Sequence, residues 1–152
     1  NEHGVKHVVV ANAPEVGSIP AFNRDEEARE LATKLTESFN AKLANGSDCM
    51  KKSTDLEIKA FDLNSKMKSM LSEYKSKGLN CQDACTSNIA DQIGRFKKNI
   101  KILLKLIFKG ELNIHYNPGC SEETLKYYFF FDYFHPTAKL HHEVGNEVYE
   151  LI

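Results

Sequence analysis

Apolar and polar positions along the first 63 residues predict a strand, a helix and a second strand. Val5 to Ala11 is a short run rich in β-branched residues, which favours a strand buried on both faces, as in parallel sheets. A loop punctuated by Pro and Gly follows, from Asn12 to Pro20. Apolar residues between Asp25 and Leu43 recur at helical spacing, which predicts a helix that Asn45-Gly46 ends. From Leu56 to Leu63, apolar and polar residues alternate and predict a second strand.

Beyond the second strand, the pattern predicts two more helices separated by a loop and an aromatic segment. Asn64 is placed to cap the first helix, and Gly78 ends it. We predict a loop from Cys81 to Asn88, and an aromatic run spans Tyr127 to Phe131. A final helix is predicted from Ala138 to Tyr149. The apolar positions at helical spacing are Met67, Met70, Leu71 and Tyr74 in the first helix, and Leu140, Val144 and Val148 in the second.

The alternation of strands and helices predicts an α/β fold with a parallel sheet. The pattern yields only two parallel strands, whereas a doubly wound sheet usually contains about five. We therefore expect further strands upstream of this chain. In this interpretation the abrupt beginning at Asn1 is a cut within a larger fold.

The composition is that of a folded domain. The chain has 152 residues, of which 41% are hydrophobic, and contains 8 Gly and 4 Pro, which argues against a disordered or collagen-like chain. The 20 Lys and Arg residues nearly balance 21 Asp and Glu, so the formal net charge is -1. This balance excludes a global basic field for nucleic acid, and no nucleic-acid partner is predicted. No apolar run reaches the ~18 residues of a transmembrane helix, and no signal-peptide pattern stands at the front.

Four cysteines and one sequon bear on the compartment. The cysteines, Cys49, Cys81, Cys85 and Cys120, have no spacing typical of a zinc site, and they predict two disulfides, with four buried thiols as the alternative. Asn45-Gly46-Ser47 is a candidate glycosylation site in a polar stretch. Together these features predict a secreted protein or one in the secretory pathway.

Asp132 and His135 form the candidate catalytic motif. They lie three residues apart, after the aromatic segment and before the final helix. A carboxylate beside an imidazole can hold one tautomer and stabilise the imidazolium that forms during proton transfer. Thr137 is placed to cap the final helix. From the residues alone, a surface Asp beside a His at a helix start is the alternative interpretation.

The segment Asp132 to Thr137, with His141 following, resembles the last conserved block of the GDSL lipases/esterases of the SGNH-hydrolase superfamily. That block reads roughly [FW]-[FW]-D-x-x-H-P-T, and Phe130 and Phe131 match its aromatic positions. Val5 to Phe22 resembles the family's strand and loop of the form G-A-[RK]-x-[IV]-V-[VF]-x-N-[LA]-P-P-[LV]-G-x-x-P. The predicted elements between these two motifs follow the family's order, so the resemblance extends over most of the chain.

The resemblance implies a serine ester hydrolase with a flavodoxin-like three-layer sandwich, of which residues 1–152 supply the C-terminal strands and helices. His135 would be the general base and Asp132 its orienting residue, with no cofactor. The family's Gly-Asp-Ser nucleophile motif and its oxyanion-hole Gly and Asn have no match here; Ser18 and Ser47 follow a Gly, but neither lies in the family's position. The expected partners are therefore an N-terminal chain that carries the serine and an acyl-ester or phospholipid substrate. Hydrolase and acyltransferase activity both fit the family.

A basic insert is predicted at about residues 88–118, a segment longer than the resembling family places between its last cysteines. Between Arg95 and Lys109 there is no acidic residue, and apolar side chains share one face of a helical wheel. Such a helix can lie on a membrane surface, or it can pack on the sheet with a solvated lysine face. By the same resemblance, a Cys85–Cys120 disulfide would close the insert and leave Cys49 with Cys81. All three connectivities, and bonds to another chain, stay open.

Two rival functions accompany the hydrolase hypothesis. The first is a non-catalytic, secreted lipid- or membrane-binding module that keeps the fold and has lost the site. The second is a metal site formed by Asp132 and the histidines. Adjacent residues such as His141 and His142 point to different faces of a helix and suit shared coordination poorly. The other histidines considered are His115 and His135.

Overall fold

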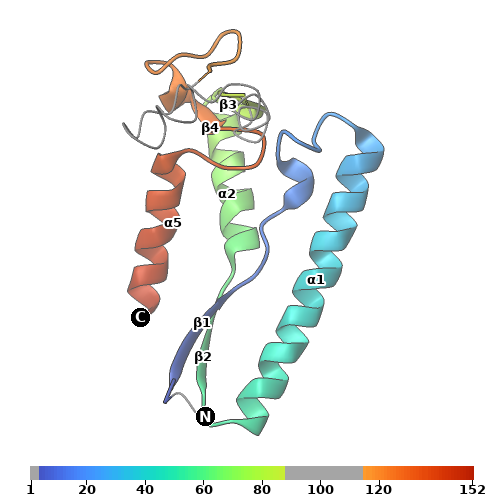
Figure 1. The fold of residues 1–152 in the computed structure, drawn as a ribbon, viewed down its shortest axis with the longest axis vertical. Helices are drawn as coiled ribbons and strands as arrows, with labels where there is room; N and C mark the ends of the chain where they lie inside the picture. The colour runs from blue at the N-terminus through green and yellow to red at the C-terminus, as the bar shows by residue number, and fades with distance from the viewer. Residues whose placement is uncertain (1–3, 88–114) are drawn as a thin grey trace, which may run out of the picture.

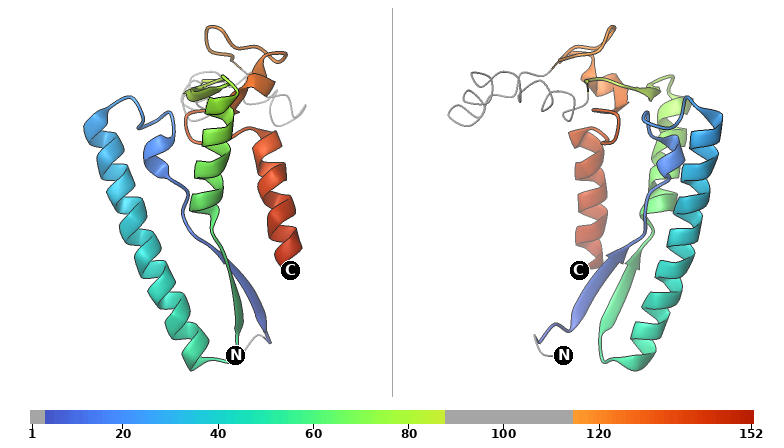
Figure 2. Two further views of the ribbon diagram at one scale, coloured as in Figure 1. Left: turned by 180° about the vertical axis from the view of Figure 1, so that it is seen from behind. Right: turned by 45° about the vertical axis from the view of Figure 1, so that its right-hand side comes forward.

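The computed structural model describes residues 4–87 and 115–152, and these residues form a mixed α/β structure (Figure 1). Its strands form two separate parallel pairs rather than one continuous sheet. In Figures 1 and 2, α2 lies between α1 and α5. The elements, in chain order, are β1 His7–Ala11, η1 Val16–Ser18, α1 Glu26–Ser53, β2 Glu57–Phe61, α2 Leu63–Ser76, β3 Asn80–Ala84, η2 Leu125–Tyr127, β4 Tyr128–Phe130 and α5 Ala138–Leu151.

The first half of the chain is a β–α–β unit. β1 and β2 pair in parallel, with His7 opposite Glu57 and Ala11 opposite Phe61. The long helix α1 connects them and returns along their length (Figure 2). Asp25 begins α1 because its carboxylate accepts a hydrogen bond from the Ala28 N–H at 2.8 Å. The unit confirms both predicted strands and the helix between them.

The predicted end of α1 at Asn45-Gly46 is wrong. The helix continues to Ser53, and the Thr54 N–H donates to the Met50 carbonyl at its end. Gly46 lies within the helix, where it costs up to about 1 kcal/mol relative to Ala. The added turns are favourable in other ways, because Lys51 and Lys52 stand in the last turn, close to the partial negative charge of the helix terminus.

The expectation that β1 is buried on both faces is also wrong. Its three valines are only half-buried, and His7 and Ala11 at its ends are exposed. The reason is that, within residues 4–87 and 115–152, β1 pairs only with β2. The apolar side of α1 is open as well, since Leu31, Leu35 and Phe39 are each more than half exposed.

Gly17 is the position where the loop after β1 meets α1. A Cβ on Gly17 would lie 2.6 Å from the Arg29 carbonyl oxygen and closer still to the Thr33 hydroxyl. The residue is buried, so a side chain there must displace α1. No other residue type fits the contact.

We therefore expect Gly17→Ala to lower the free energy of unfolding by about 1–3 kcal/mol, the usual cost of overpacking. Gly46→Ala is the matched control, because a Cβ on Gly46 meets nothing within 4 Å. It should raise stability by about 0.5–1 kcal/mol through helix propensity. Urea unfolding of both variants checks this, and equal effects at the two glycines would contradict the described packing.

Asp62, rather than Asn64, caps α2. The Asp62 carboxylate accepts hydrogen bonds from the Ser65 N–H at 3.1 Å and from Asn12 Nδ2 at 2.8 Å. Hydrogen bonding from Ser65, and then from Asn12, holds the pKa of Asp62 below its ordinary value. Asn64 is already in the first turn, where its N–H donates to Asn12 Oδ1 at 2.8 Å. The polar residues that follow β1 and β2 thus tie the two strand ends together.

The predicted loop from Cys81 to Asn88 is partly wrong, because Asn80–Ala84 forms strand β3, parallel to β4. The sequence of β3 contains no β-branched or aromatic residue, so local propensity gives no sign of a strand. Pairing with β4, almost 50 positions away in sequence, creates it. Asn80 Oδ1 accepts hydrogen bonds from the N–H groups of Gln82 and Asp83, and the register shifts between Asn80 and Ala84.

The core joins α2, β4 and α5, and it confirms the predicted helix faces. Tyr74 meets Phe129 edge-on with ring centroids 5.2 Å apart, and Phe129 meets Phe130 at 4.9 Å. Burial raises the pKa of Tyr74. The buried cluster consists of Met67, Met70, Tyr74, Phe129, Phe130 and Leu140.

Every helix in the described ranges, 4–87 and 115–152, is too short or too polar to cross a membrane.

Candidate functional site

The chain reverses direction directly after β4, and this reversal brings Asp132 and His135 together. Phe130 forms an antiparallel bridge with Pro136. The Phe131 N–H donates to the His135 carbonyl at 2.9 Å, and the Thr137 N–H donates to the Phe129 carbonyl at 2.9 Å. The returning chain is therefore hydrogen-bonded along β4, and these bonds restrict the backbone conformation of the turn between Asp132 and His135.

The Asp132 carboxylate is the fixed member of the pair, because it is 1% exposed. Its Oδ1 accepts hydrogen bonds from the N–H groups of Phe134 and His135, both at 2.8 Å. His135 Nδ1 lies 2.9 Å from Oδ1 and 3.0 Å from Oδ2. A buried carboxylate needs such donors, and here the turn itself supplies them.

The His135 imidazole is the accessible member. Its side chain is 64% exposed, in contrast to the buried carboxylate that holds it. With Nδ1 donating to Asp132, the neutral ring carries its lone pair on Nε2. Within residues 4–87 and 115–152, Nε2 makes no hydrogen bond. The geometry is that of a base held in one tautomer and open to a substrate or a nucleophile on its outer side.

Thr86 stabilises the start of the turn through hydrogen bonds to Phe131. Both its N–H and its hydroxyl donate to the Phe131 carbonyl, each at 2.8 Å, one residue before Asp132. Thr86 is 1% exposed and forms an antiparallel bridge with Tyr116. Sequence reasoning missed Thr86, because nothing in its local pattern signals a contact 45 residues away.

Cys85 and Cys120 form a disulfide, with Cα atoms 5.4 Å apart. This confirms the pairing that the resemblance implied. The bond adjoins Thr86, and the Cys85 N–H donates to the Phe130 carbonyl at 3.1 Å, two residues before Asp132. Asn117 also holds this segment in place, because its N–H donates a hydrogen bond to the Cys85 carbonyl at 2.8 Å.

The second expected disulfide, Cys49–Cys81, is not formed. Cys49 is exposed on α1 and Cys81 lies half-buried in β3, and both are free. The physical reason is distance: Cys49 lies near the C-terminal end of α1, at the opposite end of the molecule from β3 (Figure 1). The alternative of four buried thiols is also wrong.

The remaining candidate residues lie apart from the Asp132–His135 pair. Ser18 lines a polar hollow with Arg24 and Asp83, and this hollow includes neither Asp132 nor His135. Hydrogen bonding from Asn80, and in second place from Arg24, lowers the pKa of Asp83. Ser47 lies on α1. No serine of the described residues hydrogen-bonds to His135.

Asn45, the glycosylation candidate, is exposed on α1. The stretch Arg95–Lys109, predicted to be amphipathic, lies outside the described residues. Ser87, just before the predicted insert, donates its N–H to the carbonyl of His115, within the insert's last few residues, at 2.9 Å.

The histidines do not form a metal site with Asp132 in the described parts of the chain, where no group of three or more potential ligands comes together. His141 and His142 are exposed on α5. His142 Nε2 is 3.3 Å from Asn146 Nδ2.

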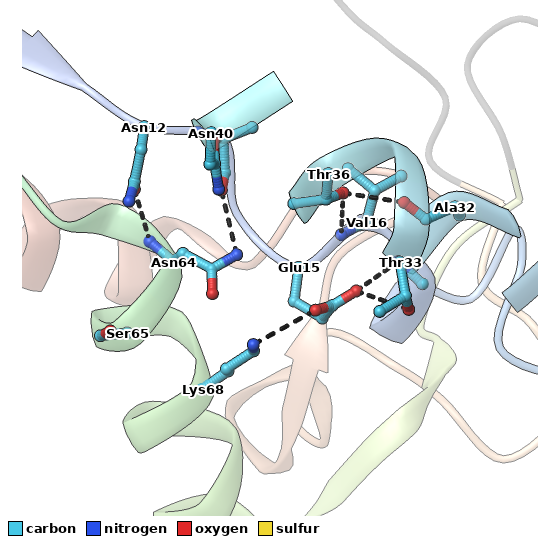
Figure 3. A network of polar contacts seen from close by, with 12 residues as sticks. Asn12, Glu15, Val16, Ala32, Thr33, Thr36, Asn40, Asn64, Ser65 and Lys68 are labelled. Carbon is cyan, nitrogen blue, oxygen red and sulfur yellow. Dashed lines mark hydrogen bonds and ion pairs between the residues drawn. The ribbon is translucent and has the colours of Figure 1, made fainter. Parts of the chain in front are cut away.

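A network of polar contacts joins the loop after β1 to both α1 and α2 (Figure 3). Glu15 is 8% exposed, and its Oε1 accepts hydrogen bonds from the Thr33 hydroxyl at 2.8 Å and the Gly17 N–H at 3.2 Å. Lys68 Nζ lies 3.3 Å from Oε2. The side-chain amide of Asn40 hydrogen-bonds to both backbone groups of Ala13. Its Nδ2 donates to the Ala13 carbonyl, and its Oδ1 accepts from the Ala13 N–H. Sequence reasoning missed this network as well.

An apolar hollow of about 190 Å³ lies directly beside the Asp132–His135 turn. Phe134 and Pro136, the residues on either side of His135, both line it. Ile19 from the loop after β1, Leu71 from α2 and Val144 from α5 form other parts of its wall.

No protein-family model matches the chain, and no curated protein is similar enough to it to count as a match.

Proposed function

We propose that this chain supplies the aspartate and histidine of the catalytic triad of a GDSL-type serine ester hydrolase. The observation that carries the proposal is the buried Asp132 carboxylate 2.9 Å from Nδ1 of the exposed His135. This is the arrangement that a triad base requires, and the two residues occupy the D-x-x-H-P-T motif that resembles the family's last block.

In the proposed reaction, His135 Nε2 accepts the proton of a serine hydroxyl while the serine oxygen attacks the ester carbonyl carbon. Asp132 stabilises the imidazolium that results. The imidazolium returns the proton to the leaving alcohol as the ester C–O bond breaks. Water then attacks the acyl-serine in the same way, and the carboxylic acid is released.

The nucleophile in this proposal belongs to an N-terminal chain that carries a Gly-Asp-Ser motif, which these 152 residues lack. The half-exposed valines of β1 and the open apolar side of α1 support such a partner, because parallel strands are normally buried on both faces. Together the two parts would complete a flavodoxin-like three-layer sandwich.

The proposed substrate class is an acyl ester or a phospholipid, with transfer to an acceptor other than water as a variant of the same chemistry. The Cys85–Cys120 disulfide indicates an oxidising compartment and supports a protein of the secretory pathway. No cofactor is needed for this chemistry.

A second candidate is a non-catalytic lipid- or membrane-binding module. The observation that favours it is the set of exposed aromatic and aliphatic side chains, with Phe134 45% and Leu35 62% exposed. In that case the Asp132–His135 pair would only stabilise the turn.

An activity assay separates the two. We expect the full protein, with any N-terminal partner chain retained, to hydrolyse a soluble short-chain ester, and a serine-directed phosphonate to abolish the activity. A chelator should leave the rate unchanged. Absence of ester hydrolysis in a preparation that contains both chains would favour the binding module, and loss of activity to the chelator would favour a metal hydrolase.

A further inference from the structure

We infer that the polar hollow between the loop after β1, α1, α2 and β3 binds the phosphate group of a ligand. This hollow, which Ser18, Arg24 and Asp83 line, has a volume of about 810 Å³. Volumes of roughly 300–1,000 Å³ are usual for ligand sites. Neither Asp132 nor His135 lines it, so the inference is independent of the proposed hydrolase and concerns a different ligand from the reacting ester.

Cationic side chains from three separate segments line the hollow. Arg24 belongs to the loop that precedes α1, Arg29 lies on α1, and Lys75 lies in the last turn of α2. Among the described residues of the lining, Asp83 is the only acidic one. Three positive charges against one negative charge leave a net charge of +2 on the lining. Clefts lined by one sign of charge concentrate ions of the opposite sign.

The ion pairs of the two arginines leave both of them available to a ligand. Nη2 of Arg24 pairs with Asp83, and a guanidinium has several N–H donors, so this pair uses only part of its capacity. Nη2 of Arg29 lies 3.2 Å from a carboxylate oxygen of Glu26, one turn earlier on the same helix. Exposed pairs of this kind contribute little to stability, so a doubly charged anion competes effectively with Glu26 for Arg29.

Lys75 has no carboxylate partner in the part of the chain that the structure describes. Its neighbour Lys77, by contrast, forms an ion pair with Glu73. Ser72 lies one turn before Lys75 on α2 and also lines the hollow. Residues three positions apart share a helix face, so the Ser72 hydroxyl and the Lys75 ammonium both face this space as hydrogen-bond donors.

A phosphate group suits these donors better than a monocarboxylate does. A phosphate ester carries about −1.5 to −2 charges at neutral pH, which matches the net charge of the lining, whereas a monocarboxylate carries a single charge. Arginine binds phosphate oxygens in bidentate pairs, and lysine binds them as a point charge. The hollow is also far larger than one phosphate group, so it has room for the organic part of the ligand.

Binding is measured first by phosphorus NMR, with pyrophosphate as the probe, on the full protein at constant ionic strength. We expect saturable broadening of the pyrophosphate signal, with acetate as a poor competitor. Absence of saturable binding, or equal competition by acetate, would overturn the inference.

Cys81 locates the bound phosphate, because its free, half-buried thiol lines the same hollow. Cys49 is the internal control, since this free thiol is exposed on α1, outside the lining (Figure 1). Alkylation of both thiols by iodoacetamide is followed by mass spectrometry with and without pyrophosphate. We expect pyrophosphate to slow modification of Cys81 about fivefold or more, because an occupied hollow restricts access to the thiol, and to leave Cys49 unchanged. Equal protection of the two thiols, or none at Cys81, would contradict the assigned site.

Variants of the lining test the same assignment without the thiols. Lys75→Gln and Arg29→Gln each remove one positive charge from the hollow, and each should weaken pyrophosphate binding about fivefold to tenfold. Both side chains are exposed, so the variants are expected to fold. Lys77→Gln is the matched control, because it removes the same charge outside the lining, and its affinity should stay within about twofold of wild type. Equal losses in Lys75→Gln and Lys77→Gln would indicate nonspecific attraction to a basic surface and would overturn the inference.

Two sources of the phosphate group are distinguished with the wild type and Lys75→Gln. Glycerol phosphate represents a soluble ester, and vesicles of phosphatidic acid in phosphatidylcholine represent a lipid headgroup. Protection of Cys81 by one of them, reduced in Lys75→Gln, identifies the source, and protection by neither would overturn the inference. His135→Ala should bind pyrophosphate as the wild type does while it loses ester hydrolysis. Hydrolysis that requires His135, without phosphate binding, would contradict this inference and leave the proposed function standing.

Discussion

Asp132→Asn is expected to lower the rate of ester hydrolysis about 10³–10⁴-fold at neutral pH. The side-chain oxygen of the asparagine can still accept hydrogen bonds from the backbone N–H groups of Phe134 and His135. Its NH2 group, however, cannot accept a hydrogen bond from the Nδ1–H group, as Oδ2 of Asp132 does at 3.0 Å, and would instead donate to an unprotonated Nδ1. This favours the imidazole tautomer that carries its proton on Nε2. That tautomer has no lone pair on Nε2 and cannot act as a base toward the serine. Steady-state kinetics on the full protein with a soluble ester measures the effect.

The matched control for this variant is Asp83→Asn. Asp83 is a half-buried carboxylate, bonded to Asn80 and paired with Arg24, and it takes no part in the proposed reaction. Its activity should stay within about twofold of wild type. Similar losses in both variants would mean that the rate responds to general destabilisation, and the role assigned to Asp132 would be wrong.

Removal of the Cys85–Cys120 disulfide is expected to cost about 4 kcal/mol of unfolding free energy. The estimate follows from the entropy of the unfolded chain, because the bond closes a loop whose ends are 35 residues apart. The Cys85→Ser/Cys120→Ser double variant, unfolded in urea, measures it. Activity should fall as well, because Cys85 adjoins Thr86, whose two hydrogen bonds hold the Phe131 carbonyl beside the Asp132–His135 turn.

Cys49→Ser provides the control, because Cys49 is exposed and free. Surface substitutions of this kind usually change stability by less than about 0.5 kcal/mol. A double variant as stable and active as Cys49→Ser would show that the disulfide neither supports the fold nor positions the turn.

The Asp132–His135 pair was predictable from the sequence, because its contacts are local. Asp132, Phe134 and His135 lie within four consecutive positions, and a turn of that length brings the carboxylate to the imidazole. The faces of α2 and α5 were predictable for a similar reason, since the spacing of Met67, Met70 and Leu140 follows the helical period.

Contacts between distant segments were not predictable. Strand β3 exists because Asn80–Ala84 pairs with β4, and its own residues carry no strand propensity. The hydroxyl of Thr86 and the carboxylate of Glu15 find their partners 45 and 18 positions away, respectively. The end of α1 was missed for a different reason, because Gly46 was interpreted as a helix stop although its neighbours continue the helix to Ser53.

The most direct test of the central claim is to locate the serine on which His135 acts. The full protein is treated with a fluorophosphonate, and tandem mass spectrometry identifies the labelled residue. We predict an adduct on a Gly-Asp-Ser serine outside these 152 residues. The adduct should be lost in His135→Ala and kept in His142→Ala, which removes an exposed histidine of α5. Labelling of Ser18 or Ser47, or labelling that is undiminished in His135→Ala, would contradict the account.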